Sequence, residues 1–173
     1  MLSLTGNGNS SQTVAELYSA ARQGVFRYLV CLGLDAERAQ DVTQEAFLRL
    51  LAAVRDGKHV SSPKSWVYRV AHNLAMDALE GDSRVSQYSE AVAETIRSLD
   101  KNAEQEMIER EWMEGFEKAV GRLSRQQRQV LELRAEGLRY REIADVLEVR
   151  TSTVGEFLRR AIHGLRKSTT WQD

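Results

Sequence analysis

The sequence predicts an all-α fold of two small helical domains joined by an acidic linker, with a helix-turn-helix in the C-terminal domain. Strong helix formers dominate the 173 residues, and only one proline and 11 glycines interrupt them. Apolar residues recur at helical spacing, and nothing reads as a strand. The charge is divided: residues 85–117 hold nine acids and three bases, whereas residues 118–167 hold twelve bases and six acids. The basic block is typical of phosphate binding, although a solvated helical face would look the same.

The first domain is predicted to follow a mobile tail and to span residues 12–80. Residues 1–11 are rich in Gly, Asn and Ser, which is typical of a mobile chain end. A helix is predicted from about Thr13 to Cys31, because its apolar residues fall on one face.

Two more helices are predicted in this domain. Asp35 can cap the second helix, which is expected to run to about Arg55. Gly57 and Pro63 then mark a loop. The third helix is predicted over about residues 64–79.

The second domain is predicted to begin after the linker. Residues 81–103 have weak periodicity and an acidic balance, which indicates the linker. The domain is predicted over residues 104–168, and its first helix over about residues 104–122.

A capping pattern and a glycine define the next helix. Ser124 and Gln127 fit the S-x-x-Q capping box that starts a helix, and Gly137 fits its C-terminal end. Two short apolar sets follow, over residues 143–149 and 154–162, joined by a polar turn. Two short helices joined in this way are typical of a helix-turn-helix that reads DNA.

The second of these helices carries an acid where bases are expected. Thr151, Ser152 and Thr153 can supply caps, and Thr153 with Glu156 fits a T-x-x-E capping box. Alternatively, a glutamate in the major groove can accept a hydrogen bond from cytosine N4. The sequence leaves both roles open, and capping or simple exposure is the more ordinary one. Phe157 can pack in the core or touch a thymine methyl, and the core is favoured.

Several classes of function are disfavoured. Cys31 is the only cysteine, so neither an internal disulfide nor a zinc signature is expected, and a small packed hydrophobe is its ordinary role. The three histidines show no ligand spacing, and we expect no metal and no cofactor. No catalytic arrangement or Gly-rich phosphate loop is recognisable. No apolar run of about 18 residues and no signal peptide is present, so a cytoplasmic protein without membrane insertion is expected.

Two motif sets resemble those of bacterial RNA polymerase sigma factors, specifically the small extracytoplasmic-function group. Residues 41–47 (DVTQEAF) fit D-x-x-Q-E-x-F, and residues 66–77 (WVYRVAHNLAMD) fit W-[LV]-Y-R-[IV]-A-x-N-x-x-x-D. Residues 123–133 and 142–149, followed by T-V and R-A, resemble the family's second domain. Glu148 departs from the pattern, because a glycine is common in that turn. If the turn needs a positive φ, glutamate there costs on the order of 1 kcal/mol.

The resemblance implies a protein without catalytic residues that binds core RNA polymerase, recognises the minus-ten and minus-thirty-five promoter elements and promotes DNA melting. Its implied partners are the beta and beta-prime subunits of core RNA polymerase, promoter DNA and an anti-sigma factor. The polymerase-binding residues it implies share one helical face: Asp41, Gln44, Glu45 and Leu48.

The resemblance also implies two sets of DNA-contacting residues. The loop of residues 57–64 and the start of the following helix would hold an unstacked base. Trp66 is more often part of the core in this pattern. Candidates for the minus-ten element are His59, Lys64, Arg69, His72 and Asn73. Candidates for the minus-thirty-five element are Arg139, Arg141, Arg150, Thr151, Ser152, Thr153, Glu156, Arg159 and Arg160.

Two rival interpretations remain. A helix-turn-helix repressor or activator acting without polymerase would explain residues 104–167 but not the motifs at 41–47 and 66–77. It predicts a dimer on a palindromic site. An interaction protein with an impaired DNA-reading surface would bind a partner without promoter-specific transcription.

Overall fold

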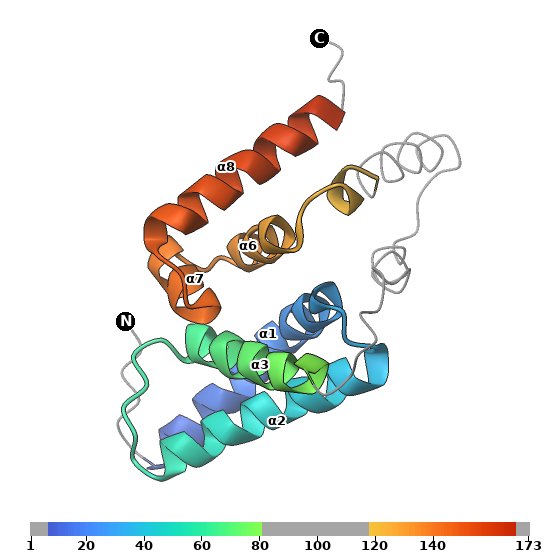
Figure 1. Ribbon diagram of the computed structural model, residues 1–173. Helices are drawn as coiled ribbons and strands as arrows, with labels where there is room; N and C mark the ends of the chain where they lie inside the picture. Colours follow the sequence, from blue (N-terminus) through green and yellow to red (C-terminus); the bar gives the residue numbers. More distant parts are fainter. Residues whose placement is uncertain (1–6, 81–117, 169–173) are drawn as a thin grey trace, which may run out of the picture.

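The computed structural model describes residues 7–80 and 118–168, and the regular elements in those two ranges are all helices (Figure 1). Three helices form the N-terminal domain: α1 (Asn7–Leu32), α2 (Ala36–Arg55) and α3 (Pro63–Glu80). Three form the C-terminal domain: α6 (Arg125–Ala135), α7 (Tyr140–Leu147) and α8 (Thr151–Ser168). The predicted all-α fold with two helical domains is therefore confirmed.

The N-terminal domain is a three-helix bundle. α1 packs along α2, and α3 contacts both of them. Tyr28 and Leu29 of α1, Leu50 of α2 and Tyr68 of α3 are completely buried between the helices. The alternation of such residues with exposed polar ones gives each helix one apolar face, and burying that face stabilises the bundle.

The first helix begins earlier than the sequence predicts. It starts at Asn7 rather than near Thr13, so residues 7–11, which were expected in the mobile tail, are helical. Asn and Ser disfavour a helix by a few tenths of a kcal/mol each, and Gly8 by about 1 kcal/mol. Extending a helix that is already nucleated adds one backbone hydrogen bond for each residue fixed.

The boundaries of α2 and α3 follow their predicted signals. The Asp35 side chain accepts a hydrogen bond of 2.9 Å from the backbone N–H of Arg38, which caps α2. Gly57 adopts a φ of 74° just after α2, where a side chain would be strained. Pro63 occupies the first position of α3, which needs no N–H donor.

The capping box at the start of α6 is confirmed. The backbone N–H of Gln127 donates to the Ser124 hydroxyl at 3.2 Å, and the Gln127 side chain accepts from the Ser124 N–H at 2.9 Å. Gly137, with a φ of 87°, ends this helical segment as predicted. The predicted linker (81–103) and most of the helix predicted over 104–122 lie outside the described residues, although residues 118–121 are helical.

The turn of the helix-turn-helix contains a strained residue. Glu148, which follows α7, has φ 53° and ψ 41°. The turn therefore has the positive φ at which glutamate is expected to be strained. Its backbone N–H donates to Ala144 O, and the next N–H, that of Val149, donates to the same oxygen at 3.0 Å. This geometry satisfies the end of α7 but favours glycine over glutamate.

Replacing Glu148 by glycine is therefore expected to raise the free energy of unfolding by about 0.5–1 kcal/mol, because relief of backbone strain exceeds the added entropy of the unfolded chain. Urea denaturation followed by circular dichroism measures the change. Glu148→Ala removes the same carboxylate but keeps the strained backbone, so it should give little gain. An equal gain from alanine would show that charge, not backbone conformation, limits stability here.

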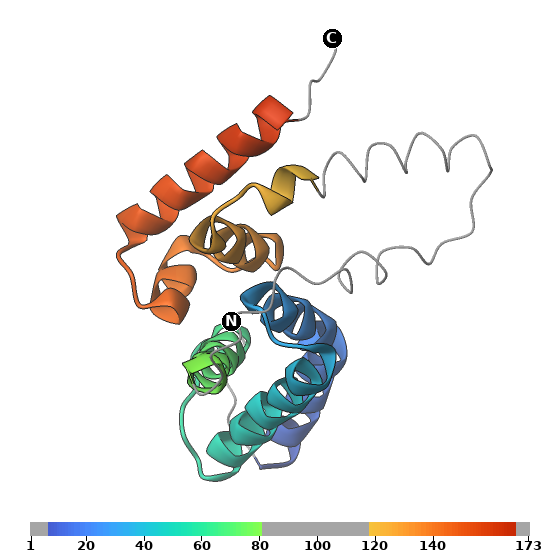
Figure 2. The ribbon, with the colours of Figure 1, turned by 45° about the vertical axis from the view of Figure 1, so that its right-hand side comes forward.

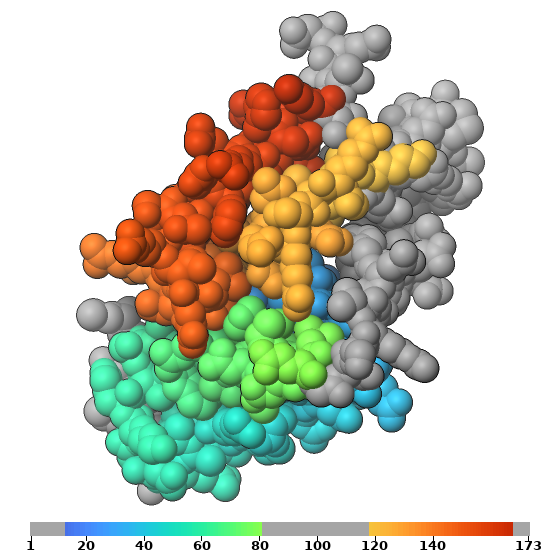
Figure 3. Space-filling model, viewed as in Figure 1, coloured from blue at the N-terminus to red at the C-terminus, as the bar shows by residue number. Residues whose placement is uncertain are grey.

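The two domains pack against each other. α6 contacts α1, and α7 contacts α3. The rotated ribbon and the space-filling view show α6 and α7 resting on the N-terminal domain (Figures 2 and 3). Buried apolar residues of both domains, such as Val67 of α3 and Ile143 of α7, belong to one cluster. In the described part of the chain, no helix combines the length and apolar character needed to cross a membrane.

Candidate functional site

One face of α2 exposes the four residues predicted to bind polymerase. Asp41, Gln44, Glu45 and Leu48 are all exposed, and their spacing places them on one side of the helix. The opposite side, which includes Ala46 and Leu50, is buried in the domain core. Leu48 has 53% of its surface exposed among polar neighbours. Leu48 thus adds an apolar side chain at the C-terminal end of a polar helix face.

Neighbouring side chains contact this face. Arg49 donates to the Glu45 carboxylate at 2.8 Å, which fixes one acid of the face. Tyr18 of α1 was expected on the apolar face of its helix, yet 38% of its surface is exposed. Its ring stands edge-on to Phe47, with the centroids 5.0 Å apart. Tyr18 therefore adds aromatic surface that sequence reasoning assigned to the core.

The minus-ten candidates do not share one environment. His59 lies exposed in the α2–α3 loop, and Arg69 and Asn73 are exposed one helical turn apart on α3. Lys64 is half-buried: its Nζ donates to the backbone oxygen of Glu136 at 2.5 Å. Three of the five predicted residues are thus accessible from solvent, whereas Lys64 is bound by the other domain.

His72 does not lie on this accessible surface. Its half-buried ring forms a hydrogen bond of 2.8 Å between Nδ1 and the Tyr28 hydroxyl. Burial, and then the Arg125 guanidinium, lowers the pKa of His72 below its ordinary value, although Glu148 opposes this shift. This hydrogen bond joins α1 to α3, and the half-buried ring leaves less of His72 open to solvent than Arg69 or Asn73.

The two aromatic residues before it also serve packing. Trp66 is partly buried against the core, as favoured from the sequence. Tyr68 is completely buried. Burial, and then the nearby Glu136 carboxylate, raises the pKa of the Tyr68 hydroxyl, which therefore stays protonated. Tyr68 therefore offers no surface on which a base can stack, whereas part of Trp66 remains exposed.

The minus-thirty-five candidates cluster around the start of α8. Thr153 is half-buried, and the other eight are exposed. Ser152, Glu156 and Arg159 follow each other at intervals of four and three residues, so they line one face of the helix. The N-terminus of α8 also presents backbone N–H groups, which attract phosphate. This arrangement suits a recognition helix whose arginines hold the DNA backbone.

The capping box predicted for Thr153 and Glu156 is wrong. α8 begins at Thr151, and the N–H groups of Thr153 and Val154 both donate to the backbone oxygen of Arg150. Thr153 is thus already inside the first turn, where its side chain cannot serve as the N-cap. Glu156 instead accepts a hydrogen bond from Arg160, four residues later. The acid partly neutralises an arginine at the predicted DNA surface.

Replacing Glu156 by glutamine should release Arg160 for a phosphate contact. Promoter binding by the complex with core polymerase is then expected to tighten at low salt. Its slope of log K against log salt should steepen by about 0.9, the value for one added phosphate contact. Fluorescence anisotropy over a salt series measures both quantities. Asp145→Asn, which removes an acid from α7, is the control. An unchanged slope would contradict release of Arg160, and lost preference at a single base pair would assign base reading to Glu156.

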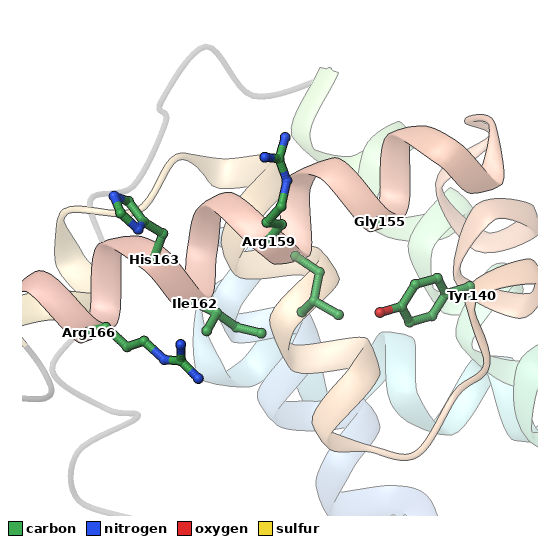
Figure 4. A pocket seen from close by; sticks show the side chains of 7 residues that line it. Tyr140, Gly155, Arg159, Ile162, His163 and Arg166 are labelled. Carbon is green, nitrogen blue, oxygen red and sulfur yellow. The ribbon is translucent and has the colours of Figure 1, made fainter.

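A shallow pocket of about 330 Å³ lies beside the recognition helix (Figure 4). Tyr140, Leu158 and Ile162 contribute apolar surface, and Arg159 and Arg166 lie at its border. Phe157 packs against the core instead, as favoured from the sequence.

Other chemistry-bearing groups form no site in the described ranges. No three His, Cys, Asp or Glu side chains in the described ranges converge to hold a metal ion. Cys31 is half-buried, and burial, with a smaller contribution from Glu132, raises the pKa of its thiol to about 11. The thiol is therefore protonated at neutral pH and a poor nucleophile.

The sequence matches two regions of a known family. Residues 17–85 match Sigma-70 region 2, and residues 113–162 match Sigma-70, region 4. The RNA polymerase sigma-H factor of Pseudomonas aeruginosa is 30% identical over 143 residues, which cover 78% of this chain and 74% of that protein. The RNA polymerase sigma factor YlaC of Bacillus subtilis is 27% identical over 91% of this chain and 92% of its own.

Two solved structures have a similar fold. The sigma factor RpoE of Bartonella quintana, in complex with the anti-sigma factor NepR, has a TM-score of 0.60 and 18% identity and covers 92% of this chain and 98% of its own. CnrH, in complex with the cytosolic domain of CnrY, has a TM-score of 0.56 and 18% identity and covers 93% of this chain and 90% of its own.

Two helical domains, one of which ends in a helix-turn-helix, define a DNA-binding transcription protein. The matches then specify the family: the chain belongs to the sigma-70 family, as an RNA polymerase sigma factor of the extracytoplasmic-function type. Its function is promoter-specific initiation of transcription.

Proposed function

We propose that the chain docks on core RNA polymerase through the α2 face of Asp41, Gln44, Glu45 and Leu48, and that the complex reads two promoter elements. The exposure of all four residues on one side of α2, with the apolar Leu48 among them, carries the proposal. A repressor or activator that acts alone has no need of such a surface far from its recognition helix. This face meets the clamp helices of the largest polymerase subunit, and the beta and beta-prime subunits of core RNA polymerase are the partners of the chain.

The DNA-reading roles are divided between the domains. His59, Lys64, Arg69 and Asn73 contact the non-template strand of the minus-ten element as the duplex opens. The exposed residues at the start of α8 contact the minus-thirty-five element, together with Arg139 and Arg141 at the N-terminal end of α7. The arginines mainly hold phosphates, and Ser152 and Glu156 face the base edges.

The chain acts without a catalytic step of its own, because polymerase performs the chemistry. It works in the cytoplasm, where a bacterial polymerase meets DNA. An anti-sigma factor is the proposed regulator. Support comes from the solved RpoE structure, which was determined in complex with the anti-sigma factor NepR.

Run-off transcription tests the proposal. Core RNA polymerase is incubated with a library of promoter fragments, with and without the protein. Initiation at a defined subset of fragments, only when the protein is present, is the expected result. Stable binding to core without initiation would favour an interaction protein. Binding as a dimer to a palindrome without core would favour a repressor or activator.

A further inference from the structure

The pocket beside the recognition helix gathers apolar side chains that the fold leaves exposed. Four large apolar side chains are exposed in the described ranges, and two of them, Tyr140 at 41% and Ile162 at 39%, line this pocket. The buried Leu158 lines it as well. The volume of about 330 Å³ falls within the range of about 300–1,000 Å³ that is usual for small-molecule sites. The pocket therefore has room for a small organic molecule.

The aromatic wall of the pocket is held in place from outside it. Tyr140 is the first residue of α7, and its side chain points toward α8 (Figure 4). The guanidinium carbon of Arg134 lies 5.8 Å from the centroid of the Tyr140 ring, which is a cation–π contact. Arg134 in turn donates a hydrogen bond of 3.0 Å to Leu138 O. A ring fixed in this way loses little conformational freedom when a ligand packs against it.

A glycine of α8 keeps the pocket open. Gly155 lies inside the helix, where glycine is less favourable than alanine, and it lacks the positive φ that would require glycine. A Cβ atom at this position would meet only Cε2 of Tyr140, at the ordinary contact distance of 3.7 Å. Packing therefore does not exclude alanine, whereas a longer side chain would fill the space next to the Tyr140 ring. The missing side chain lowers helix stability and leaves room in the pocket.

Three basic side chains border this apolar surface. Arg159, His163 and Arg166 follow each other along α8 at intervals of four and three residues, which places them on one side of the helix. None of the residues that line the pocket is acidic. Outside the pocket, by contrast, Arg160 is paired with Glu156. The pocket thus combines apolar surface with positive charge that no lining residue neutralises.

This combination indicates the chemical class of the ligand. A neutral apolar molecule would make no use of the bordering cations, and a sugar-phosphate chain would make little use of the apolar wall. A flat apolar body that carries one carboxylate, sulfonate or phosphate fits both, because its rings pack on Tyr140 and Ile162 while its acid binds an arginine. We propose that this pocket binds a small amphipathic anion of this kind, and that the bound anion competes with promoter DNA for Arg159.

The competition follows from the position of Arg159. This residue borders the pocket and also lies on the α8 face of Ser152 and Glu156, which is the proposed DNA-reading face. An acid bound to Arg159 removes one phosphate contact and places negative charge beside the DNA backbone. The competition rests on the proposed minus-thirty-five role of Arg159, whereas binding of the anion does not. A small molecule would then act directly on promoter recognition by this sigma factor.

Binding is tested on the full free chain with anilinonaphthalene sulfonate, whose fluorescence rises when it enters an apolar site. N-phenylnaphthylamine has the same rings without the sulfonate and is the matched neutral probe. Arg166→Gln removes a bordering charge and should weaken binding of the sulfonate by about 10-fold, while binding of the neutral probe should change by less than about 2-fold. Lys167→Gln is the control, because it removes the same charge from a neighbouring residue that does not line the pocket.

A second variant closes the pocket by shape. Gly155→Leu fills the space next to Tyr140, and leucine favours the helix, so α8 should form normally, as far-ultraviolet circular dichroism would show. It should abolish binding of both probes. Gly121→Leu adds the same side chain where a Cβ meets nothing within 4 Å, and it should bind both probes like the wild type. Sulfonate binding that survives Gly155→Leu, or that Arg166→Gln and Lys167→Gln weaken equally, would overturn the pocket as the binding site.

The competition is measured with the chain bound to core RNA polymerase, as the fluorescence anisotropy of a red-labelled minus-thirty-five duplex. Saturating sulfonate should weaken duplex binding by the wild type by about 10-fold, and it should not affect the Gly155→Leu variant. Probe binding without any effect on the duplex would overturn the competition.

Two further outcomes separate this proposal from the proposed function. Weaker duplex binding by Arg166→Gln, in a chain that binds neither probe, would assign the pocket to the DNA backbone and overturn the ligand site. Probe binding as expected, with no duplex binding by any variant or by the wild type, would refute the minus-thirty-five role and the competition that rests on it, and would leave the ligand site.

Discussion

Replacing Leu48 by aspartate is expected to weaken binding to core RNA polymerase by about 100-fold, or about 2.7 kcal/mol, and to abolish run-off transcription at limiting protein. The substitution removes the apolar contact of the α2 face and puts a charge where the interface excludes water. Leu48 is 53% exposed in the free chain, so stability should change by no more than about 0.5 kcal/mol. Titration of fluorescently labelled core with each variant gives the dissociation constants.

The matched control for this experiment is Gln126→Asp. Gln126 is also exposed, but it lies on α6 in the other domain. The control adds the same charge outside the proposed contact, so binding should stay close to that of the wild type. Equal losses in both variants would indicate a general charge effect and would contradict a docking surface that includes Leu48.

Replacing Leu50 by alanine is expected to lower the free energy of unfolding by about 2–5 kcal/mol. Leu50 is 0% exposed and packs inside the three-helix bundle, so the change leaves a cavity as well as losing apolar burial. A loss of this size is comparable with the whole stability of a small domain. Urea denaturation followed by circular dichroism measures it.

Leu48→Ala provides the comparison for Leu50→Ala. The two leucines lie two positions apart on α2 and face opposite directions, so the same three carbon atoms are removed from solvent in one case and from the core in the other. Leu48→Ala should cost no more than about 0.5 kcal/mol. A cost below about 1 kcal/mol for Leu50→Ala would show that α2 does not pack against α1 and α3 as described.

Local signals in the sequence predicted most of the fold. Asp35 before α2, and Ser124 with Gln127 before α6, act within a few residues of themselves, so their hydrogen bonds can be read without knowing the tertiary structure. The apolar periodicity of α2 likewise predicted the buried side, which includes Ala46 and Leu50, whereas Leu48 was placed on the exposed side only by the family resemblance.

The prediction of how α8 is capped was wrong because two sequence patterns fit the same residues. Thr153 and Glu156 have the spacing of a capping box, but Arg150 already accepts the first hydrogen bonds of α8, so the pattern starts three residues too late. Residues 156 and 160 have ion-pair spacing as well, and this second pattern is the one that the structure uses. The sequence could not show that the ring of His72, a minus-ten candidate, is hydrogen-bonded to Tyr28, because that contact joins α1 to α3 across 44 residues.

The contacts between the domains could not be predicted at all. Arg27 and Glu136 are 109 residues apart in the sequence, and neither belongs to a recognisable motif. Their pairing depends on how two complete domains meet. Gly24 is a weak sign of this pairing in the sequence. A glycine inside a helix lowers helix stability, so its presence suggests close packing by another part of the chain.

Gly24 also has a consequence for how this regulator can evolve. Any single-nucleotide change in a glycine codon either is silent, introduces a stop or adds a side chain, and every added side chain begins with a Cβ that would lie within 2.6 Å of the Glu136 carboxylate. One point mutation at this codon therefore suffices to move Glu136 off α1, while every proposed DNA-contacting residue is retained.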